Sequence, residues 1–192
     1  MPASVRPATA ADATACVEIY RPYVLDTVIT FETDVPTVEE MADRIVEALV
    51  MHEWLVLEAD GQVTGYAYAR QFNSRAAYQW SVETSVYLAQ DRLRSGGGRM
   101  LYAELLRRLT QRGFRRAFAG IAQPNDASNA LHRAFGFRPA GHHRRVGWKL
   151  GAWHDVQWWQ LDLVGPHDAG DPPCPLDQKA PLDQKALLDQ NE

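Results

Sequence analysis

The stretch Glu83-Thr-Ser-Val-Tyr-Leu88, Ala89-Gln-Asp-Arg-Leu-Arg-Ser-Gly-Gly-Gly-Arg99 and Met100-Leu-Tyr-Ala-Glu-Leu-Leu106 reads as a strand, a basic glycine loop and an amphipathic helix. Glycines let the backbone turn tightly and come close to a ligand. A helix that begins directly after such a loop points free N–H groups and its positive dipole end at the loop. Together with the arginines of the loop, this predicts a site for a phosphate or pyrophosphate group.

The composition is typical of a soluble globular protein with one domain. The chain has 192 residues, of which 46% are hydrophobic and 23% charged, and its formal net charge is −4. The negative charge argues against a nucleic-acid partner, and no apolar run approaches the ~20 residues that span a membrane. Cys16 and Cys174 lie far apart, which indicates free thiols in a reducing compartment. Because residues 1–6 lack an apolar signal region, we expect a cytoplasmic protein.

The pattern along the chain predicts a mixed sheet in an α/β or α+β arrangement. Capping boxes at Thr9 and Thr37 each open a helix, and Asp60-Gly61 is a hairpin signal. Hairpins and helical crossovers both occur, in the order β-α-α-β-β-β-α-β-α-β-β. The expected strands lie near 5–6, 53–59, 62–70, 78–88, 116–122, 138–146 and 156–163, and the expected helices near 9–20, 37–50, 98–112 and 125–136. Residues 21–36 are expected to be irregular.

The composition changes after Val164, so residues 1–164 are predicted to form the domain. The segment 165–192 is rich in Pro, Asp, Gln and Lys and repeats the triplet Leu-Asp-Gln three times. This repeat is far too short for a solenoid unit. We expect a disordered tail, with a helical docking peptide as the alternative.

Four motifs resemble those of the GNAT N-acetyltransferases, and more narrowly those of the phosphinothricin and methionine sulfoximine N-acetyltransferases. They are Trp80–Leu88, Arg94–Arg99, Pro124–Ser128 with His132 and Gly136-Phe137 after it, and Gly151–Val156 with Trp159–Asp162. The resemblance covers about residues 4–163. It implies a mostly antiparallel, twisted sheet flanked by helices, acetyl-CoA as co-substrate, a small-molecule amine as acceptor and a homodimer. Leu93 departs from the Gln or Arg usual three residues before the first glycine, but backbone amides should preserve cofactor binding.

The resemblance implies two catalytic residues. An α-amine is largely protonated at pH 7, so acetyl transfer requires a group that removes a proton. Glu83 is implied as this general base, and the alternative is a strand carboxylate that faces solvent. His132 is implied as a proton donor or substrate contact, and the alternative is a histidine on the helix surface.

Further residues are implied to bind the cofactor and the acceptor. The cofactor-binding residues are Val86, Tyr87, Leu88, Arg94, Ser95, Gly96, Gly97, Gly98, Arg99, Asn125 and Ser128. Asn125 and Ser128 can equally serve to cap the following helix. The substrate-binding residues are Phe31, Arg75, Tyr78 and Ser85. Arg75 suits an acidic group because a guanidinium binds carboxylate or phosphinate with two hydrogen bonds.

Other functions remain open at this point. The acceptor amine could instead be a polyamine or a protein N-terminus, although Arg75 would repel a polycation. A non-catalytic acyl-CoA-binding module is a further alternative, against which Glu83 and His132 count. A P-loop is disfavoured because no Gly-Lys-Ser/Thr follows the glycines. His142-His143 and His154-Asp155 lack a convincing third ligand, so we expect no metal site.

Overall fold

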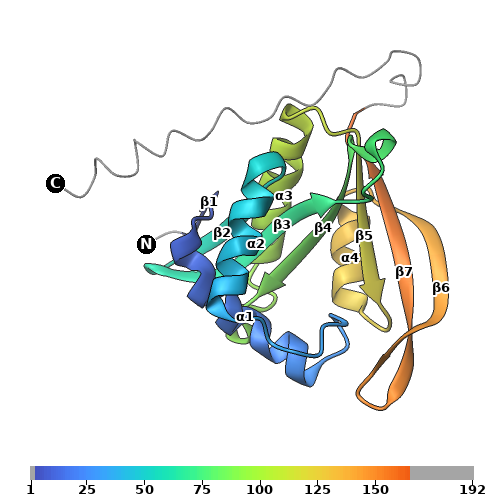
Figure 1. Ribbon diagram of the computed structural model, residues 1–192, viewed down its shortest axis with the longest axis horizontal. Coiled ribbons are helices and arrows are strands. Elements are labelled where there is room, and N and C mark those ends of the chain that lie inside the picture. Colours follow the sequence, from blue (N-terminus) through green and yellow to red (C-terminus); the bar gives the residue numbers. More distant parts are fainter. Residues whose placement is uncertain (1–2, 165–192) are drawn as a thin grey trace.

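A seven-stranded sheet of order β1-β2-β3-β4-β5-β7-β6 forms the centre of the computed structural model, which describes residues 3–164 (Figure 1). Every neighbouring pair is antiparallel except β4 and β5, which are parallel. The strands are β1 (Ser4–Pro7), β2 (Trp54–Ala59), β3 (Gln62–Gln71), β4 (Ser81–Leu88), β5 (Arg116–Ala122), β6 (Arg138–Lys149) and β7 (Ala152–Asp162). The predicted mixed sheet is thereby confirmed. The predicted tail, 165–192, lies outside the described residues.

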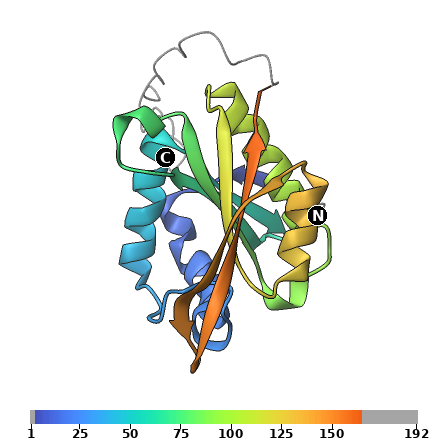
Figure 2. The ribbon, with the colours of Figure 1, turned by 90° about the vertical axis from the view of Figure 1, so that its right-hand side faces the viewer.

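Helices cover both faces of the sheet. They are α1 (Ala13–Asp26), α2 (Val38–Met51), α3 (Gly97–Gln111) and α4 (Asp126–Ala134), with short 3₁₀ turns η1 (Ala10–Asp12), η2 (Ala76–Tyr78) and η3 (Gln90–Arg92). Figure 2 shows α1 and α2 on one face, and α3 and α4 on the other. Each pair encloses its own apolar core, one around Leu101 and Leu105 of α3 and one around Ile45 of α2.

Side chains along β4 point alternately to the two faces of the sheet, so the β4 residues expected in the active site are divided between these faces. Val82 is buried in the core under α3, and the Thr84 hydroxyl contacts Tyr102 of α3. Glu83 therefore faces the side of α1 and α2, as does Tyr87, which is buried in their core.

Helix α1 is longer than the sequence predicts. We expected it to end near Tyr20, but it continues through Pro22 to Asp26. Proline removes one helical hydrogen bond and usually breaks a helix. Here the apolar stripe continues beyond it, because Tyr23 and Val24 are buried like Cys16 and Tyr20 before it. Burial of this stripe outweighs the local cost of the proline.

Three strand limits also differ from the predictions. β4 begins at Ser81, because Tyr78 belongs to η2. β6 and β7 extend towards each other to Lys149 and Ala152, beyond the limits expected near 146 and 156. Leu150 and Gly151 form the turn with φ of 49° and 78°, the paired positive values of a tight hairpin turn. Because the strand register shifts between His143 and Gly147, a simple alternation of side chains does not predict this hairpin.

Candidate active site

Strands β4 and β5 separate at Glu83, and a cavity opens between them. Their paired residues are Ser81–Glu83 with Arg116–Phe118, and no pair follows in the described sheet. The cavity measures about 50 Å³ and reaches from α4 to the α1–α2 loop. Its lining residues are Ile29, Thr84, Ser85, Val86, Tyr87, Ala119, Gly120, Ile121, Asn125, Ser128 and His132. The fold therefore brings together six of the residues expected in the site: Ser85, Val86, Tyr87, Asn125, Ser128 and His132.

The glycine loop leads from β4 into the first turn of α3. Gly96 is the N-cap residue with φ of 87°, a conformation that side chains disfavour, and a Cβ added there would meet no atom within 4 Å. Gly97 is buried, and a Cβ there would lie 2.6 Å from Leu57. The Arg99 N–H donates to the carbonyl oxygen of Gly96 at 3.0 Å, whereas the N–H groups of Gly97 and Gly98 have no acceptor within the helix and can receive an anion. Arg99 lies over the Phe135 ring, 5.6 Å from its centre. The loop thus has the form of a phosphate cradle.

Glu83 lies at the point where the strands separate, and its side chain is 18% exposed. Arg70 is directly opposite on β3, and its Nη2 donates to Glu83 Oε1 at 2.9 Å. Glu83 is thus a partly exposed, ion-paired acid on the α1–α2 side of the sheet.

An aromatic cluster lies beside Glu83. Phe118 is its neighbour on β5, and the Phe72 ring stacks on Phe118 with centres 4.1 Å apart. Trp158 and Tyr78 approach Phe72 edge-on, at 6.2 Å and 5.8 Å. Tyr78, expected to bind substrate, therefore contacts Phe72, which in turn stacks on Phe118, the neighbour of Glu83.

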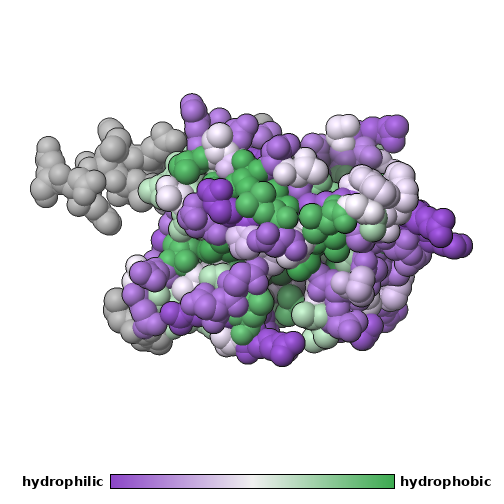
Figure 3. Space-filling view, turned by 90° about the horizontal axis from the view of Figure 1, so that it is seen from below, coloured by the Kyte–Doolittle hydropathy of each residue, from purple (hydrophilic) through white to green (hydrophobic). Residues whose placement is uncertain are grey.

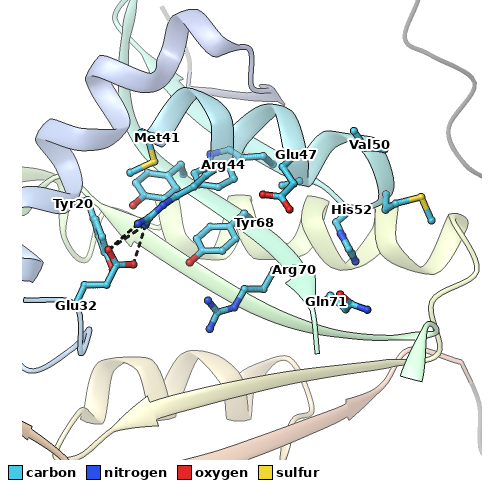
Figure 4. A pocket seen from close by; sticks show the side chains of 14 residues that line it. Tyr20, Glu32, Met41, Arg44, Glu47, Val50, His52, Tyr68, Arg70 and Gln71 are labelled. Atoms are coloured by element: carbon cyan, nitrogen blue, oxygen red, sulfur yellow. Dashed lines mark hydrogen bonds and ion pairs between the residues drawn. The ribbon is translucent and has the colours of Figure 1, made fainter. Parts of the chain in front are cut away.

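A groove of about 630 Å³ runs along the same face between α2 and β3. Tyr68 and Arg70 line it from β3, and Arg44 of α2 forms a two-pronged ion pair with Glu32 across one end (Figure 4). A groove of this size accommodates a small organic ligand. Arg70 thus both lines the groove and pairs with Glu83.

His132 is 3% exposed and both of its ring nitrogens have protein partners. Nδ1 lies 2.7 Å from the carbonyl oxygen of Ser128, and Nε2 lies 2.7 Å from the Tyr102 hydroxyl. Burial lowers the pKa of His132 below its ordinary value, while the bond to Ser128 acts in the opposite direction. The alternative of a helix-surface histidine is wrong.

Asn125 caps α4, since its Oδ1 accepts from the N–H of Ser128 at 3.1 Å. The capping role expected as one alternative is confirmed. Ser128 also holds His132 through its carbonyl oxygen, so this cap fixes the start of the helix that carries the histidine.

The α1–α2 loop is fastened to the β6–β7 hairpin. Lys149 is buried, and its Nζ donates to the carbonyl oxygen of Thr30 at 2.8 Å. The adjacent Phe31 lies against Gly147, where a Cβ would overlap its ring. Figure 3 views this side of the molecule and shows hydrophobic residues among hydrophilic ones. The exposed apolar residues of the loop and the hairpin tip are Ile29, Phe31, Val146, Trp148, Leu150 and Trp153.

Arg75 lies in the exposed connection before η2, where its backbone N–H donates to Asn73 Oδ1.

Sequence reasoning missed Arg70, Tyr102 and Lys149. Alternation along β3 could have placed Arg70 on the face of Glu83, but only with the strand register known. Nothing local marks the other two, whose partners are distant in the sequence.

Within residues 3–164, no group of three or more His, Cys, Asp or Glu side chains could hold a metal ion. His142 instead pairs with Asp155 across β6 and β7, at 2.8 Å. Over the same residues, none of the helices has both the length and the apolar character needed to cross a membrane.

The chain is similar to known acetyltransferases over most of its length. Residues 5–158 match the family model described as "Acetyltransferase (GNAT) domain". A phosphinothricin N-acetyltransferase of Streptomyces viridochromogenes is 40% identical over 86% of this chain and 90% of its own. A methionine sulfoximine/methionine sulfone acetyltransferase of Salmonella typhimurium is 34% identical over 83% and 94%. A solved phosphinothricin acetyltransferase of Sinorhizobium meliloti in complex with AcCoA has a TM-score of 0.85 and 38% identity, covering 91% and 94%. The chain belongs to the GNAT acetyltransferase family.

Proposed function

We propose that this acetyl-CoA-dependent N-acetyltransferase acts on the α-amine of a small amino acid or analogue that carries an acidic group. The Arg70–Glu83 ion pair supports this proposal most directly. It places a carboxylate and a guanidinium side by side next to the cavity between β4 and β5. An amino acid presents the complementary pair, an ammonium and a carboxylate.

The residues fit acetyl-CoA, which supplies the acetyl group as an activated thioester. The first-turn N–H groups of Gly97 and Gly98 would hold the pyrophosphate, and Gly96 permits the necessary turn. The pantetheine arm would lie along Val86–Leu88, where β4 no longer pairs with β5. A backbone N–H near Val86 could then polarise the thioester carbonyl.

Glu83 would remove the proton from the acceptor amine, directly or through water. The ammonium group would compete with Arg70 for this carboxylate. The released guanidinium is then available to a carboxylate of the acceptor, and the neighbouring groove offers room for the remainder of the molecule. Arg75, Tyr78 and Phe31 stay candidates for contacts with a second acidic group.

Phosphinothricin and methionine sulfoximine are the first acceptors to test, because the relatives are named for them. Release of the CoA thiol should be measured with these compounds, with acidic and neutral amino acids, and with spermidine. We expect the acidic amino-acid analogues to give the highest kcat/KM. Spermidine as the best acceptor would overturn the proposed acceptor class, and no thiol release with any amine would favour an acyl-CoA-binding module.

We also propose a cytoplasmic homodimer. Trp148, Leu150 and Trp153 at the hairpin tip are more than half exposed, and an apolar tip of this kind suits a contact with a second copy. Sedimentation equilibrium at micromolar concentration tests this: we expect a mass of twice 21.6 kDa. A monomer under these conditions would contradict it.

A further inference from the structure

A chain of four hydrogen bonds lies at the point where β4 and β5 separate. It begins at the Ser128 carbonyl oxygen, 2.7 Å from His132 Nδ1. His132 Nε2 and the Tyr102 hydroxyl are 2.7 Å apart, and the Tyr102 and Thr84 hydroxyls are also 2.7 Å apart. The chain ends where Thr84 Oγ1 lies 3.1 Å from the carbonyl oxygen of Phe118.

The number of hydrogens in this chain depends on the charge of His132. Both ends are carbonyl oxygens, which only accept, so the four bonds need four hydrogens from the three side chains between them. Tyr102 and Thr84 supply one each. A neutral His132 supplies one more, and the total of three leaves one bond unmade. A protonated His132 supplies two, and the total of four completes the chain.

The distances indicate which bond is missing when His132 is neutral. The contact between Thr84 and Phe118 is the longest of the four at 3.1 Å. Nδ1 must carry the hydrogen, because it faces the Ser128 carbonyl oxygen. Tyr102 then donates to Nε2, and Thr84 donates to Tyr102. When Nε2 gains a proton, the Tyr102 hydrogen turns to Thr84 and the Thr84 hydrogen turns to Phe118. The proton comes from solvent hydronium, so one O–H bond of hydronium breaks, water is released, and the N–H bond on Nε2 forms.

We propose that Tyr102 and Thr84 form a reversible hydroxyl relay that fixes the tautomer of His132 and provides it with an acceptor when it takes up a second proton. They are positioning residues, since they act through His132. The relay opposes the effect of burial, which lowers the pKa of this histidine. It lets a buried imidazole change its charge beside the cavity while every ring nitrogen keeps a partner.

The surroundings single out Tyr102 as the group that acts on the ring. Besides Tyr102, α3 carries Arg99 in its first turn, β4 carries Glu83 on its opposite face, and α4 carries Arg133 next to His132 in the chain. Arg99 lies over Phe135, Arg133 lies over Trp159, and Glu83 pairs with Arg70. Of these groups, Tyr102 is the one in contact with the imidazole.

Nitrogen NMR of the free protein tests the relay. Histidine-labelled protein would be titrated with pH, and the His132 signals assigned by their loss in His132→Gln. We expect the Nδ1–H tautomer in the neutral wild type. Tyr102→Phe should lower the pKa of His132 by roughly one unit, because the charged ring loses an acceptor. Thr84→Val should also lower it, although Tyr102 remains in contact, because the turned Tyr102 hydrogen then has no acceptor.

Thr64→Val is the matched control. Thr64 is also a buried strand threonine whose hydroxyl donates to a carbonyl, that of Leu57, outside the relay. We expect it to leave the pKa of His132 unchanged. An unchanged pKa in Thr84→Val would overturn the relay even if Tyr102→Phe failed to fold, as would an Nε2–H tautomer in the wild type. The measurement needs neither acetyl-CoA nor an acceptor, so its failure is distinct from a failure of the proposed function.

Discussion

Arg70 Nη2 lies 2.9 Å from Glu83 Oε1, and the two residues are directly opposite each other in the β3–β4 register. The proposed base is thus already paired with a cation before an acceptor arrives. Arg70 is much more exposed than Glu83, with 59% against 18% of the side chain accessible. If Glu83 is the base, an acceptor ammonium group competes with Arg70 for this carboxylate.

Replacing Glu83 by Gln keeps the shape of the side chain and removes its basicity. We expect kcat at pH 7 to fall ~10²-fold or more. The deficit should shrink at high pH, where the acceptor amine loses its proton unaided. Steady-state rates across the pH range check this, with acetyl-CoA affinity as the control that should not change. Wild-type turnover at pH 7 would place the base elsewhere.

Replacing Arg70 by Met keeps the aliphatic stem and removes the guanidinium. We expect KM to rise roughly tenfold for an acceptor with a free α-carboxylate, a modest effect because Arg70 is partly exposed. The corresponding amino-acid amide should lose nothing, since it has no carboxylate to bind. Comparing KM for the two acceptors checks this. Equal losses would mean that Arg70 only orients Glu83.

Arg75→Ala is the companion to this variant. If Arg75 binds a second acidic group, its removal should raise KM for phosphinothricin and leave a neutral amino acid unaffected. The two arginines would then recognise different parts of the acceptor. If Arg75→Ala changed KM for none of the acceptors, Arg75 would have no part in acceptor binding and would only contribute to the exposed turn before η2.

The glycine loop makes a prediction about acetyl-CoA binding. Gly96→Val introduces a branched side chain at a φ of 87°, where the loop amides should approach the pyrophosphate. We expect it to abolish most of the rise in Tm that acetyl-CoA gives, while Arg99→Ala loses only part. Thermal unfolding with and without acetyl-CoA measures this.

Gly151→Val is the matched control, because Gly151 has a φ of 78°, similar open space and a place in the remote β6–β7 turn. It should lower Tm but keep the full rise with acetyl-CoA. A full rise in Gly96→Val as well would remove the loop from the cofactor site.

Local signals in the sequence predicted most elements of the fold. The capping box at Thr37 forms as expected, with Thr37 Oγ1 accepting from the N–H of Glu40 and Glu40 Oε2 accepting from the N–H of Thr37. The Asp60-Gly61 turn joins β2 to β3 with both φ values positive. Each feature depends on residues within one turn of chain, so a single sequence reveals it. Pro22 misled for the same reason: its local effect is clear, and the packing that outweighs it is not.

The contacts of the site depend on register and on distant neighbours. Thirteen positions separate Arg70 from Glu83, and thirty separate Tyr102 from His132. Alternation assigns Arg70 to a face of β3 but does not say which residue of β4 lies opposite. In the sequence, Tyr102 occupies an ordinary apolar position of α3, and in the structure its side chain is fully buried there. Its hydroxyl gains a role only after α3 and α4 pack on the same face.

Burial of His132 predicts a loss of stability in acid. Its pKa in the folded protein is below the ordinary value of 6.5, so near pH 6 the unfolded chain binds more protons than the folded one. The free energy of unfolding should therefore fall as pH drops from 6.5 towards the folded pKa, and then level off in this contribution. His132→Gln should reduce that slope, and His143→Gln, on the exposed part of β6, should not. Urea unfolding at several pH values measures both, and equal slopes in His132→Gln and wild type would contradict the argument.

Lys149 fastens the α1–α2 loop to the β6–β7 hairpin, because its Nζ donates to the carbonyl oxygen of Thr30. Lys149→Met fills a similar volume but leaves this buried oxygen without its donor, which should cost about 1–3 kcal/mol of unfolding free energy. The freed loop should also displace Phe31, so we expect KM for the acceptor to rise while the Tm gain from acetyl-CoA stays the same. Urea unfolding and acceptor kinetics measure the two effects separately. A loss of stability with an unchanged KM would show that Lys149 holds the fold together without shaping the acceptor site.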